Sequence, residues 1–193
     1  SVVISVVERM RQEGILADSK DISAYIMDVG DSERKSRALL ERFAKLEKYI
    51  LSHIPDESLR ISCKQLNDNV INDGINTSKE KDIRTLLYFL TIKGYIRKKE
   101  DPLHNMEITL RSDMKSTINR FERRLEISRL TIKWLFGMEN TASNEDKEKR
   151  MIQFSILELL NHVKAASHSI FNEPYDFQIE DVEEALLYLS KIG

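Results

Sequence analysis

Three helices are predicted between residues 32 and 94, because apolar side chains recur there every three or four positions. A serine that can cap the first turn precedes each helix, at Ser32, Ser62 and Ser78. Gly74 leaves only a tight link between the second and third helices, and Gly94 provides a stop after the third. The apolar stripes are Leu39, Phe43, Leu46 and Ile50, then Leu66 and Val70, then Ile83, Leu86, Leu87 and Leu90.

Short extended segments complete this pattern. Residues 59–61 precede the second helix, and residues 95–99 and 106–111 are predicted as two strands joined by the polar turn at residues 101–105. The order helix, strand, helix, tight turn, helix, strand, turn, strand is typical of a winged helix-turn-helix. We therefore assign residues 32–112 to a winged-helix domain, a fold that usually contacts DNA.

Helical periodicity continues on both sides of this domain. Residues 1–31 are predicted as an N-terminal helical connector, with one helix through Val3 and Met10 and a short helix containing Ile22, Tyr25 and Ile26. A long helix is predicted at residues 113–136, followed by a polar loop at residues 137–146. Its apolar face, expected to pack along its whole length, is Met114, Ile118, Phe121, Leu125, Ser128, Ile132 and Leu135.

The second half of the chain repeats part of the first. Residues 61–66 (ISCKQL) resemble residues 154–159 (FSILEL), and Asp82-Ile83 corresponds to Asp181-Val182. Leu87, Leu90 and Gly94 correspond to Leu186, Leu189 and Gly193. We interpret this as two tandem winged helices in a mainly α protein with small β wings, the second at residues 113–193 and truncated before its wing. The alternative is a chance likeness of amphipathic helices.

Charge distinguishes the two copies. The 193 residues have a formal net charge of −2, so DNA contact requires a local basic patch. Residues 78–94 sum to +2 and are followed by a basic strand, whereas the matching residues 177–193 sum to −3. The DNA-binding candidates are therefore Lys79, Lys81, Arg84, Arg97, Lys98 and Lys99. The alternative is a solvated helix face.

Motifs for catalysis are not found in this sequence. It has no phosphate-binding loop, no GxSxG or HExxH motif, and a single cysteine, Cys63. We therefore expect no active site, cofactor or metal in this segment. No apolar run is long enough for a membrane span and no signal peptide is recognisable, so a cytoplasmic location is expected. The missing initial Met indicates a piece of a longer chain.

Three stretches resemble a known family. Residues 12–22 (QEGILADSKDI) resemble a segment that follows the motor core in bacterial RecQ-like, superfamily II ATP-dependent DNA helicases. Residues 154–159 and 179–193 (IEDVEEALLYLSKIG) are similar to later segments of the same proteins.

The resemblance implies that this chain is the C-terminal accessory region of a helicase, gripping duplex or forked DNA mainly through phosphates. ATP and Mg²⁺ would bind in upstream motor lobes that this chain lacks, and the acidic second copy could bind a protein partner. Two features depart from the family. The turn at residues 101–105 has no aromatic residue, which puts a strand-separating pin in doubt, and the four-cysteine zinc module is missing.

Two other functions remain open from the sequence. One is a free-standing transcriptional regulator that binds a specific site as a dimer, with the helix at residues 113–136 as the dimer seam. The other is a winged-helix scaffold for protein interactions that does not touch DNA.

Overall fold

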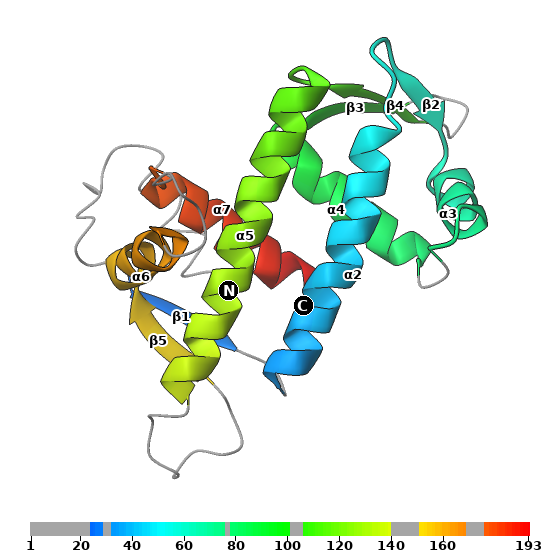
Figure 1. Cartoon of the computed structure of the whole chain (residues 1–193). Coiled ribbons are helices and arrows are strands. Elements are labelled where there is room, and N and C mark those ends of the chain that lie inside the picture. Colours follow the sequence, from blue (N-terminus) through cyan, green and yellow to red (C-terminus); the bar gives the residue numbers. More distant parts are fainter. Residues whose placement is uncertain (1–23, 29–31, 76–77, 101–105, 140–150, 169–175) are drawn as a thin grey trace.

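A computed structural model describes residues 24–28, 32–75, 78–100, 106–139, 151–168 and 176–193. This part of the chain is mainly helical (Figure 1). The helices are α2 (Glu33–Ser52), α3 (Cys63–Asn72), α4 (Glu80–Ile92), α5 (Met114–Glu139), α6 (Ile156–His168) and α7 (Ile179–Ile192). The strands are β1 (Ala24–Asp28), β2 (Leu59–Ile61), β3 (Ile96–Glu100), β4 (Met106–Leu110) and β5 (Met151–Ser155).

Side-chain caps begin two of the helices as predicted. The Ser32 hydroxyl accepts a hydrogen bond from the Lys35 amide at the start of α2, and the Ser62 hydroxyl accepts one from the Gln65 amide at the start of α3. The prediction that Ser78 caps the next helix is wrong. Lys79 occupies the N-cap of α4, while the buried Ser78 hydroxyl donates to the side-chain oxygen of Asn67 at 2.8 Å. Ser78 therefore ties α4 to α3.

A three-stranded antiparallel sheet with the order β2-β4-β3 lies beside α3 and α4 (Figure 1). Gly94, with a φ of +70°, turns the chain from α4 into β3, a conformation that glycine adopts without steric cost. Helices α2, α3 and α4 with this sheet are compatible with a winged-helix-like arrangement. The turn at residues 101–105 lies outside the described residues.

Strand β1 replaces a predicted helix. Residues 24–28 pair antiparallel with β5, from Ala24 opposite Ser155 to Asp28 opposite Met151. The short helix expected through Tyr25 and Ile26 is therefore wrong, because a strand partner from the far half of the chain overrides the local helical spacing. The helix predicted through Val3 and Met10 lies outside the described residues.

Helix α5 is central to the fold. It packs against α2 on one side and α7 on the other, with α6 near its C-terminal half (Figure 1). The predicted apolar face is buried from Phe121 to Leu135, whereas Met114 and Ile118 are half-buried. A second buried row lies beside it, at Thr117, Arg124, Ile127 and Thr131. The buried side chains of both halves form one continuous cluster.

The order of elements in the first half recurs in the second. Helix, strand, helix, helix is α2, β2, α3 and α4 in one half and α5, β5, α6 and α7 in the other. Strands β2 and β5 each run directly into the following helix, at Ser62 and Ser155. The division at residue 112 stays a prediction.

Candidate nucleic-acid interface

Helix α4 has one face in the core and one face toward solvent. The buried side consists of Asp82, Ile83, Leu86, Leu87, Phe89 and Leu90. Lys81, Arg84, Tyr88 and Ile92 are exposed, and their steps of three and four residues place them along one stripe. The sequence therefore determines which side of α4 can reach a ligand.

An ion pair at its N-terminal end fixes how α4 is rotated. Asp82 is buried and receives a hydrogen bond from Arg42 of α2 at 2.5 Å. Because Asp82 faces α2, Lys81 and Arg84 are directed away from the core. The Asp82 carboxylate thus forms its ion pair within the fold.

The predicted basic residues of α4 are all exposed, but their partners differ. Arg84 is 67 % exposed, and its guanidinium donates to Glu80 one turn earlier, with Nη2 at 2.5 Å. This hydrogen bond raises the pKa of Arg84. Lys79 and Lys81 form no ion pair within the described part of the chain. Lys79, at the N-cap, is also next to the amide groups of the first turn, which favour anions.

Strand β3 contributes the other three candidates. Ile96 is buried, while Arg97, Lys98 and Lys99 are all exposed. Side chains alternate along a strand, so Arg97 and Lys99 lie on one face of the sheet and Lys98 on the other. The three residues therefore do not form one row, although all three are free of ion pairs among the residues described.

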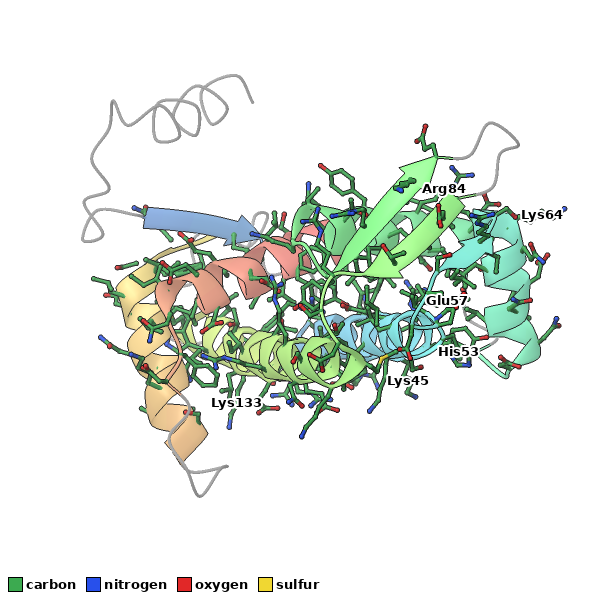
Figure 2. All side chains as sticks on the ribbon, turned by 90° about the horizontal axis from the view of Figure 1, so that it is seen from above. Lys45, His53, Glu57, Lys64, Arg84 and Lys133 are labelled. Carbon is green, nitrogen blue, oxygen red and sulfur yellow. The ribbon has the colours of Figure 1, made fainter. Side chains whose placement is uncertain are left out.

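The two elements that carry these residues, α4 and β3, contact each other. In Figure 2, Arg84 is on the side that contains β3 and β4. Lys45 of α2 and Lys133 of α5 project on the opposite side. Residues 79–100 contain seven basic and three acidic side chains, against a net charge of −2 for the chain. The local excess of positive charge is the feature that a polyanion would recognise.

Sequence reasoning missed three members of this surface. Tyr88 is 56 % exposed and Ile92 is 46 % exposed, the large apolar side chains in the described residues that are most open to solvent. Lys64, on the first turn of α3, is exposed as well. Tyr88 and Ile92 could have been found from the sequence, because their helical spacing from Lys81 and Arg84 places them on the same face of the helix.

Two of the four acidic residues of α7, Asp181 and Glu184, bind within the fold. Asp181 accepts hydrogen bonds from Arg123 at 2.6 Å and from the amide of Gln178 at 2.8 Å. Glu184 accepts from Arg120 and from the hydroxyl of Tyr95, both at 2.5 Å. These two carboxylates thus connect α7 to α5 and to the residue that precedes β3, whereas Glu180 and Glu183 are exposed.

A groove of about 1160 Å³ lies between α2, α5 and the start of α7, on a different surface. Its charged lining is balanced: Lys45, Lys48, Arg120, Arg123 and Arg129 against Glu41, Glu122, Glu126, Glu180 and Asp181. Several of these pair with each other, and the hydrogen bond from Arg129 lowers the pKa of Glu41. With no excess of either sign, this groove has no charge preference for a polyanion.

The described residues contain no group of three or more potential metal ligands. None of their helices combines the length and apolar character needed to cross a membrane. The chain matches no family model, no curated protein and no solved structure.

Proposed function

We propose that this chain is a non-catalytic DNA-binding region made of two tandem winged helices, of which the first binds DNA. The observation that carries the proposal is the environment of the six candidate residues. All six are exposed on α4 and β3, and Arg84 alone has an ion-pair partner within the described residues. Long basic side chains that are held out from a folded element without partners are available to phosphate groups.

The arrangement around α4 supports a helix-turn-helix. Gly74, just after α3, has a φ of +95°, which suits a sharp reversal of the chain. In this motif the second helix enters the major groove with its N-terminal residues toward the bases, and the first crosses the backbone. Lys81 and Arg84 would then face the groove, and Lys64 and Arg97 the flanking phosphates.

The second module has the same order of elements as the first, with one difference in strand pairing. Strand β5 precedes α6 as β2 precedes α3, but β5 pairs with β1, whereas β2 pairs with the wing strand β4. The N-terminal strand thus takes the place of a wing strand. Because Asp181 and Glu184 of α7 bind arginines of α5, we propose that this module supports the first one, and that it could also dock a protein partner.

Contacts of this kind depend on salt more than on sequence. Neutralised phosphates release condensed cations, so affinity falls steeply as salt rises. We further propose, from the family resemblance, that the parent protein is an ATP-dependent helicase whose motor lobes bind ATP and Mg²⁺. A dimeric regulator is less well supported, because the positions proposed as its seam, including Phe121, Leu125 and Ile132, are buried within one chain.

The test is binding to fluorescent duplex DNA at low salt, measured by anisotropy with several unrelated sequences. The double variant Lys79→Glu with Arg97→Glu should bind at least about tenfold more weakly than the unmodified chain. The matched control, Lys45→Glu with Lys133→Glu, makes the same charge change on the opposite side and should bind at least about threefold more tightly than that variant. Equal loss in both variants, or no binding by the unmodified chain, would contradict the proposal.

A further inference from the structure

Tyr88 lies on the DNA-facing stripe of α4 beyond the basic residues. It follows Arg84 by four residues and Lys81 by seven, about 6 Å and 10 Å along a helix axis. More than half of its surface is exposed, and Ile92, a turn later, is also exposed. The stripe is therefore basic in its first half and apolar in its second.

A cation from the other half of the chain flanks this aromatic ring. The Nζ of Lys191, at the end of α7, lies 5.7 Å from the centre of the Tyr88 ring. Helix α7 reaches this position because it packs across α4. The ring thus has the ammonium of Lys191 beside it, and Arg84 precedes it by one turn on the same helix, with its guanidinium directed toward Glu80.

We propose that Tyr88 stacks against an unpaired base of a nucleic acid strand that leaves the duplex, with Lys191 and Arg84 contacting its phosphates. This inference rests on the proposed function and names its substrate class as DNA with a single-stranded arm. Aromatic side chains between basic ones are the usual platform for single strands, because every base offers a flat face.

The exposure of the Tyr88 ring favours a strand that leaves a duplex. Bases inside a duplex are already stacked on their neighbours, so an exposed ring gains little there. Since the N-terminal half of a recognition helix enters the groove, Tyr88 would lie near the groove edge, where a departing strand passes.

The experiment compares two DNAs of the same duplex sequence, one blunt and one with a short single-stranded arm. The arm contains a fluorescent adenine analogue at its first unpaired position. The unmodified chain should bind the armed DNA more tightly and quench the analogue. Tyr88→Ala should bind the armed DNA about tenfold more weakly, with a change below about twofold on the blunt duplex. Tyr88→Phe, which keeps the ring, should behave like the unmodified chain.

Other results would overturn the inference. These are equal affinity of the unmodified chain for the two DNAs, or no quenching of the adenine analogue. A Tyr88→Ala variant that loses the same affinity for both DNAs, or loses affinity for neither, would overturn it as well. Failure of the proposed function looks different, because it appears as blunt-duplex binding that is unaffected by Lys79→Glu with Arg97→Glu. Absence of all DNA binding contradicts both. Thermal unfolding of each variant checks that the exposed position leaves the fold intact.

Discussion

Arg124 of α5 donates hydrogen bonds from Nη2 to both carboxylate oxygens of Glu47 in α2, each at 2.6 Å. Their side chains are only 3 % and 0 % exposed. The guanidinium also lies over the ring of Tyr188 in α7, 4.2 Å from its centre. Burial by itself would lower the pKa of Arg124, but the Glu47 carboxylate raises it above its ordinary value. This pair joins the leading helices of the two halves.

Replacing Glu47 removes the nearest compensating carboxylate of the buried Arg124 guanidinium, and Glu184 lies farther away, at 3.9 Å from Nη1. We expect Glu47→Gln to lower the free energy of unfolding by about 3–5 kcal/mol. Urea denaturation measures this loss. In the matched control Glu122→Gln, the affected pair with Lys48 is 54 % and 60 % exposed, so the loss should stay below about 1 kcal/mol. Similar losses for both variants would show that the buried pair is not special.

The helices were predictable from the sequence, but this pair was not. The stripe of Leu46 and Ile50 shows the buried face of α2, and Phe121 and Leu125 show that of α5. Nothing local indicates that Glu47 faces an arginine in another helix. Helical spacing identifies the buried face of a helix but does not identify the element that packs against it. For the same reason the sequence could not show that residues 24–28 pair with β5, and a helix was predicted there.

Two glycines should respond in opposite directions to the same substitution. Gly94 has a φ of +70°, so Gly94→Ala should destabilise the fold by about 1 kcal/mol through backbone strain. Gly137 is inside α5 with open space around its α-carbon, so Gly137→Ala should stabilise by about 0.5–1 kcal/mol. Thermal and urea unfolding report both, and a shared sign would refute the assigned conformations.

Alkaline pH should weaken the fold through Tyr95. Burial is the main reason that its pKa is raised above the ordinary value, and the Glu184 carboxylate adds to it. Because the folded pKa exceeds the unfolded value of about 10, the contribution to stability is complete below that pH and is lost as the pH rises. Unfolding free energy should therefore fall above pH 10 more steeply in the unmodified chain than in Tyr95→Phe, by up to about 1.4 kcal/mol per pH unit. Parallel curves would contradict this.

Glu80 restrains the proposed interface. It holds Arg84 in an ion pair and places a negative charge beside the exposed stripe of Lys81, Arg84, Tyr88 and Ile92. Glu80→Gln should free Arg84 and strengthen duplex binding by roughly two- to fivefold at low salt, with a smaller gain at high salt. Fluorescence anisotropy at two salt concentrations measures this. Unchanged or weaker binding would mean that this face of α4 does not meet the phosphates.

The candidate site was only partly predictable for a related reason. Charge along the sequence identified Lys79, Lys81, Arg84, Arg97, Lys98 and Lys99, and the structure places all six in solvent. Charge alone could not show that Lys98 faces away from Arg97 and Lys99, although the strand predicted at residues 95–99 implies it, because side chains alternate along a strand. Nor could it show Tyr88 beside Lys191, because these residues meet through the packing of α7 on α4.

The salt dependence of duplex binding tests the central claim most directly. If the six basic residues contact phosphates, a plot of log affinity against log salt should have a slope of about −5. Lys81→Ala should reduce that slope by about 1, and Lys45→Ala, on the opposite side, should leave it unchanged. A slope near zero, or an equal change for Lys45→Ala, would contradict DNA binding through α4 and β3.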